Sequence, residues 1–102
     1  MSPREIQPPG GRYKGLHAVY TSDSRGWKKL CQSMPGPMHK CYIELADNPF
    51  PHGQLRRHHQ MKGKLKEFWE YEVAGGARVR YKRGINNEII VVYAGAAPPD
   101  TH

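Results

Sequence analysis

The tripeptide Ala-Gly-Gly at 74–76 lies between two runs in which apolar and charged residues alternate. These two runs constrain the fold more than any other part of the chain. Such alternation is typical of β-strands with one buried face, and a short turn containing Gly between them predicts a hairpin. We therefore predict antiparallel strands at residues 68–73 and 77–82, with all charged side chains on one face. The predicted cross-strand pairs are Val73 with Ala77, Glu72 with Arg78, and Glu70 with Arg80.

Ahead of this hairpin, apolar residues recur twice at the spacing i, i+3, i+4 and i+7, which marks one face of an α-helix. The first stripe is Trp27, Leu30, Cys31 and Met34, and the second is Met38, Cys41, Tyr42 and Leu45. Residues 21–24 offer N-cap oxygens to the first helix, Pro35-Gly36-Pro37 breaks it, and Asn48-Pro49 ends the second. The pattern predicts a helical hairpin that lays one apolar face on a sheet.

Two further segments complete the predicted order. Residues 16–20 are a short strand candidate, and residues 88–93 (EIIVVY) are apolar on both faces, as expected of a central strand covered on both sides. Residues 1–15 are rich in Pro and Gly and lack periodicity, which predicts a flexible N-terminal arm before one domain at 16–102. We predict a single α+β domain of order β-α-α-β-β-β, with the helical hairpin packed on a mostly antiparallel four-stranded sheet.

The 102-residue chain carries a formal net charge of +7. This excess favours a polyanionic or acidic partner, although it also serves simple solubility. No apolar run is long enough to span a membrane and no signal peptide is visible, so we expect a cytoplasmic protein without a membrane partner. Cys31 and Cys41 lack CxxC spacing and are expected as buried thiols, while the histidines form no zinc-finger pattern. No metal or other cofactor is therefore expected.

The charged face of the predicted hairpin has two interpretations. Charge runs on sheets are common, and alternating Glu and Arg are most simply cross-strand ion pairs on a solvated face. The alternative is RNA cleavage, in which attack by a 2′-hydroxyl needs a base, cations on the phosphate and an acid for the leaving oxygen. Aromatic rings can also stack on an unpaired base. Residues of the required types are His58, His59, Lys62, Lys64, Glu70, Glu72, Arg78, Arg80 and Tyr93.

The segment from His59 to Tyr71, HQMKGKLKEFWEY, resembles the "LKG–hydrophobic–WEYRV" segment of RelE/ParE-type toxins of bacterial toxin–antitoxin systems. The following GARVRY resembles their "GYRVIY" strand, and EIIVVYAG resembles their last strand with the Gly after it. The order β-α-α-β-β-β is similar as well. The resemblance covers roughly residues 16–95 and is strongest from 58 to 95.

This resemblance implies a type II toxin that cleaves messenger RNA, usually on the ribosome, and that a small cognate antitoxin neutralises. By position, Arg78 corresponds to the strand arginine on the scissile phosphate, His58 or His59 to a His before the LKG segment, and Lys62 to the LKG lysine. The expected catalytic residues are Arg78, Arg80, His58, His59, Glu72 and His102. The expected RNA-binding residues are Arg56, Arg57, Lys62, Lys64, Lys66, Lys82 and Tyr93.

Two features depart from the family pattern. Gly95 is followed by Ala96-Ala97-Pro98-Pro99, where the family commonly has a basic or His-containing stretch, and Glu70 and Glu72 stand where RelE-like members carry lysines. The same scaffold would therefore also suit a non-cleaving, ParE-like gyrase inhibitor or a catalytically degenerate RNA-binding relative.

Overall fold

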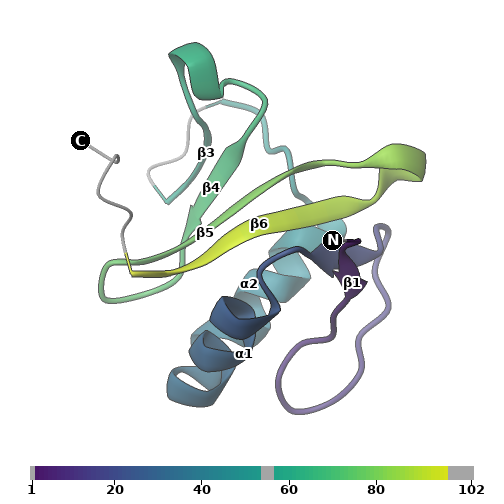
Figure 1. Ribbon diagram of the computed structural model, residues 1–102, viewed down its shortest axis with the longest axis vertical. Coiled ribbons are helices and arrows are strands. Elements are labelled where there is room, and N and C mark those ends of the chain that lie inside the picture. Colours follow the sequence, from purple (N-terminus) through teal and green to yellow (C-terminus); the bar gives the residue numbers. More distant parts are fainter. Residues whose placement is uncertain (1, 54–56, 97–102) are drawn as a thin grey trace.

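The computed structural model describes residues 2–53 and 57–96, which form an α+β fold with two helices packed on a mixed six-stranded sheet (Figure 1). The elements, in chain order, are β1 (Arg4–Glu5), β2 (Val19–Thr21), α1 (Ser24–Ser33), α2 (Pro35–Asp47), β3 (His58–Gln60), β4 (Trp69–Glu72), β5 (Ala77–Arg83) and β6 (Ile89–Ala96). Two short 3₁₀ turns, η1 (Gly63–Leu65) and η2 (Ile85–Asn87), lie in the β3–β4 and β5–β6 connections. Among the described residues, no helix has the length and apolar character needed to cross a membrane.

The strand order is β1-β2-β6-β5-β4-β3, and every neighbouring pair is antiparallel except β2 with β6. The α+β class and the helical hairpin were predicted correctly, but the expected four-stranded sheet was wrong because two edge strands extend it. Strand β1 comes from the segment expected as a flexible arm, where Arg4 pairs with Thr21 and Glu5 with Tyr20. Both edge strands are short and polar, so they carry no alternating pattern that a sequence reading can detect.

The central hairpin has the predicted register. Glu70 lies opposite Arg80 and Glu72 opposite Arg78, and the N–H of Val73 donates to the carbonyl of Ala77 at 2.9 Å. The turn between them uses two glycines at positive φ, 55° at Gly75 and 87° at Gly76. Residues with a Cβ atom adopt a positive φ only with a loss of stability, which explains why the turn contains a Gly pair.

The two helices follow each other almost without a loop. Asp23 caps α1 by accepting a hydrogen bond from the N–H of Gly26 at 3.1 Å, and Met34 is the only residue between α1 and α2. The prediction that Pro35-Gly36-Pro37 breaks the first helix is confirmed, because α1 ends at Ser33 and α2 begins at Pro35 itself. Proline suits the first turn of a helix, where its missing N–H would have no partner. Asn48 caps the end of α2, as the sequence predicted.

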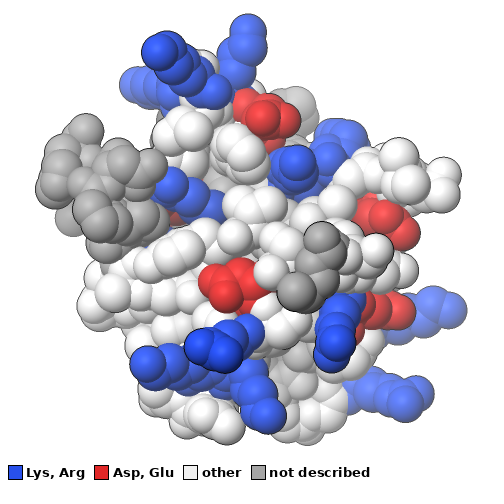
Figure 2. Space-filling view, in the orientation of Figure 1, with Lys and Arg blue, Asp and Glu red and all other residues white. Residues whose placement is uncertain are grey.

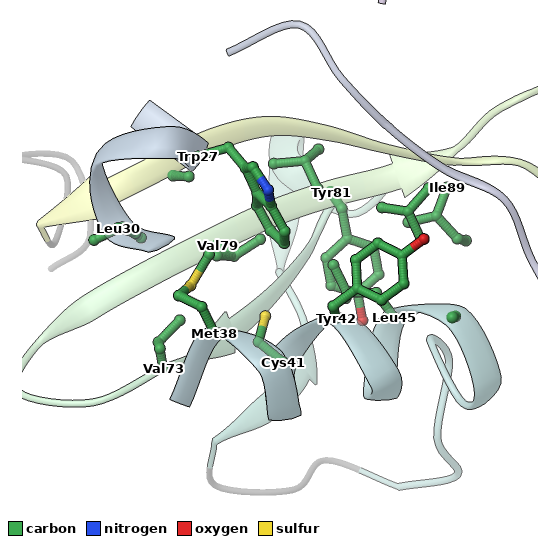
Figure 3. Packing of buried hydrophobic residues seen from close by; sticks show 14 of the residues in the cluster. Trp27, Leu30, Met38, Cys41, Tyr42, Leu45, Val73, Val79, Tyr81 and Ile89 are labelled. Atoms are coloured by element: carbon green, nitrogen blue, oxygen red, sulfur yellow. The ribbon is translucent and has the colours of Figure 1, made fainter. Parts of the chain in front are cut away.

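The core lies between the helices and one face of the sheet (Figure 3). The whole second stripe is buried, whereas in the first stripe only Trp27 and Leu30 are. Cys41 is fully buried but Cys31 only partly, and burial raises the pKa of both thiols. Strand β6 is central, yet the prediction that it is covered on both sides was wrong: both helices lie on the face that carries its buried residues, Ile89, Val91 and Ala94.

Candidate functional site

The sheet face turned away from the helices gathers most of the charged strand residues. Side chains of paired residues share a face, so strand pairing places the Arg80 partner Tyr93 and the Glu70 partner His59 on the same side as the charged ladder. We call this surface the open face. The members that matter for the site are His59, Phe68, Glu70, Glu72, Arg78, Arg80, Lys82, Tyr93 and Gly95.

The carboxylates and guanidiniums of the open face form one continuous ladder. Arg80 Nε donates to Glu70 Oε2 at 3.0 Å, Arg78 Nε lies 3.4 Å from Glu70 Oε1, and Arg78 Nη1 lies 3.5 Å from Glu72 Oε2. The predicted cross-strand ion pairs therefore form. They are not simply solvated, because Glu70 is only 4% exposed and Arg80 only 9%.

A buried carboxylate between two guanidiniums has two effects. It fixes the direction of both Arg side chains, and it offsets part of their charge. Arg78 lies at the more exposed side of the ladder, with 21% of its side chain accessible to solvent. Arg78 is therefore the ladder cation best able to reach an anion from solvent while staying held in position.

The two adjacent histidines are separated by the sheet. His58 pairs with Tyr71 on the core face, where its Nε2 lies 3.2 Å from the carbonyl of Pro49 and also contacts the Tyr81 hydroxyl. Burial lowers the pKa of His58 to about 4, so the ring is neutral at neutral pH. His59 is partly exposed on the open face, across from Glu70. Of these two histidines, only His59 lies on the same sheet face as Arg78.

The β3–β4 connection, residues 61–68, brings lysines to the edge of the open face. Lys62, Lys64 and Lys66 are all exposed, and Figure 2 shows Lys and Arg side chains projecting at the top of the view, where Figure 1 places this connection. These lysines do not alternate along an extended strand, because η1 turns the chain at Gly63, whose φ is 67°. Lys82 Nζ lies 5.9 Å from the centre of the Phe68 ring and joins this cationic rim.

A small hollow lies between this connection and strands β5 and β6. Its volume is about 200 Å³, and its lining is Met61, Leu65, Phe68, Arg80, Val92 and Tyr93. Sequence reasoning missed the hollow because it treated the segment as basic and overlooked its apolar residues. A register irregularity next to Arg80 also shifts the pairing of β5 with β6, so that Arg80 pairs with Tyr93 and Tyr81 with Val91. An alternating sequence pattern does not predict this shift.

Tyr93 is held in a fixed position beside the ladder. Its hydroxyl donates a hydrogen bond to the carbonyl of Ala96. A Cβ atom at Gly95 would lie 3.0 Å from that hydroxyl oxygen, so the ring lies over a glycine that leaves room for it. Because Gly95 pairs with Arg78, the Tyr93 ring extends along β6 toward the exposed end of the ladder.

The remaining candidates are placed as follows. Arg57 is exposed, and its carbonyl accepts a hydrogen bond from the N–H of Glu72 at 2.7 Å. Arg56 and His102 lie outside the described residues. Within residues 2–53 and 57–96, no group of three or more His, Cys, Asp or Glu side chains could hold a metal ion.

A scan of protein-family models, a search of curated proteins and a search of solved structures found no match to this chain. The functional interpretation of the open face therefore depends on its own geometry and on the sequence resemblance described above.

Proposed function

We propose that the open face binds RNA and that the protein is a toxin-type endoribonuclease that cleaves messenger RNA without a metal. The observation that carries this proposal is the convergence of one imidazole, two guanidiniums, two carboxylates and one phenol on a single sheet face with a lysine rim. These groups are the ones that phosphodiester cleavage by a 2′-hydroxyl requires. The resemblance to RelE/ParE-type toxins favours the same activity.

In the proposed reaction, the 2′-oxygen attacks the adjacent phosphorus and the bond to the 5′-oxygen breaks. The proton of the 2′-hydroxyl passes to a base, and an acid protonates the leaving 5′-oxygen, which gives a cyclic 2′,3′-phosphate and a 5′-hydroxyl end. Arg78 would stabilise the charge that develops on the phosphate oxygens, because it is cationic, oriented and accessible. Glu72 would orient Arg78 through their 3.5 Å ion pair.

His59 is our candidate for proton transfer. Its imidazole is partly exposed on the same sheet face as Arg78, and an imidazole can give or accept a proton. His58 is assigned a structural role instead, because its ring is buried and contacts Pro49 and Tyr81. The exposed lysines of the β3–β4 connection would contact the RNA backbone and supply sequence-independent affinity.

The proposal also includes two partners that the resemblance implies. The first is the ribosome, on which a toxin of this type meets its message. The second is a cognate antitoxin that neutralises the toxin, and the net charge of +7 suits an acidic antitoxin as well as RNA.

The test uses the purified chain mixed with a defined message, with and without translating ribosomes, and maps cuts by primer extension. EDTA is present in the ribosome-free reaction. We expect cuts that disappear in Arg78→Ala and fall strongly in His59→Ala. Lys28→Ala, an exposed cation on α1, is the matched control and should cut like the unchanged chain.

Each outcome of this assay is informative only if the variants are folded, which circular dichroism and thermal unfolding establish. Absence of cuts under all conditions, from folded protein, would remove the nuclease. If messages stay intact, a separate test asks whether the chain inhibits gyrase or whether its expression in cells induces DNA-damage signalling. Either result would indicate a protein target instead of RNA.

A non-cleaving RNA-binding protein is a second candidate that one observation favours. Both open-face arginines contact Glu70, which reduces the charge available to a transition state. Such a protein would retain RNA in a filter-binding assay at low salt and would leave the RNA intact.

A further inference from the structure

We propose that the hollow beside Arg80 is a subsite for a single unstacked RNA base. This inference rests on the proposed RNA-binding function and names the part of the ligand that the hollow receives. The hollow is the apolar part of the open face, and it adjoins the ladder because Arg80 belongs to both.

The size of the hollow suits one base. Its volume is about 200 Å³. A single flat ring system is small enough to enter such a space. RNA recognition commonly uses bases that are splayed out of the strand in this way.

The lining also suits a base. Two of the lining residues, Phe68 and Tyr93, are aromatic, Arg80 is the only charged one among them, and the remaining residues are apolar. Bases stack on aromatic and guanidinium planes regardless of their identity. The hydrogen bond of Tyr93 to Ala96 and the glycine beneath its ring hold this wall in place, so little side-chain freedom is lost when a base binds.

The charges around the hollow select a nucleotide over an uncharged ring. Lys82 lies over the Phe68 ring, and Lys62 and Lys64 are exposed on the connection that forms one side of the hollow. On the other side, Arg80 leads to Arg78 through their shared contact with Glu70. A base in the hollow would therefore have cations on both sides for its two flanking phosphates.

The test begins with amide chemical shifts of the ¹⁵N-labelled chain during titration with each of the four ribonucleoside 5′-monophosphates. Ribose 5-phosphate, which lacks the base, is the control ligand. We expect saturable shifts at Met61, Phe68, Val92 and Tyr93 with the nucleotides and none at these amides with ribose 5-phosphate.

Variants that fill the hollow extend the test to RNA. Val92→Phe fills it from β6, and Leu65→Phe fills it from the connection, so the result does not depend on one strand tolerating a larger side chain. Each should weaken binding of a ten-nucleotide RNA by about tenfold, which is a typical loss for one stacked base. Leu16→Phe, at a side chain that is 80% exposed elsewhere, is the matched control and should leave binding unchanged.

The outcomes separate this inference from the proposed nuclease. Base-dependent shifts with no RNA cuts would support the subsite and remove the nuclease. RNA cuts or binding with no shifts in the hollow, and with both filling variants unaffected, would overturn the subsite alone. If an acidic, Leu-containing synthetic peptide shifts these amides and the nucleotides do not, the hollow receives a protein side chain and the subsite is likewise overturned.

Discussion

Arg80 Nε and Glu70 Oε2 lie 3.0 Å apart on a sheet face that no helix covers, yet both side chains are at least nine-tenths shielded from solvent. The pair is shielded although it lies outside the main core. A buried ion pair contributes little net stability, but it strongly disfavours any state in which only one partner is charged. The pair therefore sets the geometry of the open face more than it adds to the free energy of unfolding.

Glu70→Gln should destabilise the fold substantially. It leaves the Arg80 guanidinium buried without its carboxylate, and breaking a buried pair typically costs about 3–5 kcal/mol. Glu72→Gln is the matched control, since the Glu72 side chain is 30% exposed and its ion pair with Arg78 is longer. That change should cost about 1 kcal/mol or less. Urea unfolding at pH 7 measures both values, and equal losses would contradict the buried-pair assignment.

Stability should fall between about pH 6.5 and pH 4 because of His58. Its pKa is lowered by burial to about 4, so the unfolded chain binds this proton more readily than the folded one. The contribution is fully present above pH 6.5 and is lost as the pH falls toward 4, by at most about 3 kcal/mol. Urea unfolding at several pH values measures the decline.

Comparison with variants isolates the histidine from other titrating groups. His58→Phe keeps an aromatic ring beside Trp69, Tyr71 and Tyr81 but cannot titrate, so its decline over this window should be shallower. His39→Gln, at an exposed position on α2, is the control variant. If the free energy of unfolding falls equally with pH in the unchanged chain and in His58→Phe, the prediction is wrong.

Replacing Lys62, Lys64 and Lys66 together by Gln should reduce the salt dependence of RNA binding. If each lysine neutralises one phosphate of a single strand, the slope of log K against log salt falls by about 2. Replacing Arg25, Lys28 and Lys29 of α1 removes the same charge from another exposed surface. Filter binding at several salt concentrations compares the two, and an equal change in slope would mean that only net charge matters.

Asp23 links α1 to the strand that carries Tyr93. Its Oδ1 accepts from the N–H of Gly26 and its Oδ2 from the N–H of Ala94, each at 3.1 Å. Asp23→Ala loses both bonds and should cost about 2–3 kcal/mol. Asp23→Asn keeps one carbonyl acceptor and should lose less, and Ser24→Ala at the exposed neighbour should lose little. Thermal unfolding gives the order, and equal losses in all three would contradict this linkage.

Local patterns were enough to predict much of this protein. The alternation around Gly75 and Gly76 determined the hairpin register that pairs Glu70 with Arg80, because a strand has only two faces and the turn is short. The second apolar stripe determined which side of α2 is buried, because helical spacing puts those four residues on one side. Both results depend on neighbours within a few residues.

Other features depended on contacts between distant segments. His58 and His59 are adjacent and chemically identical in the sequence, and only the pairing of β3 with β4 turns one into the core and the other toward Arg78. The hollow needs the β3–β4 connection to fold over strands β5 and β6. The sequence alone thus determined the helices, the central hairpin and the ladder. Tertiary structure decided the edge strands, the histidine on the open face and the hollow, because long-range pairing sets them and local periodicity does not.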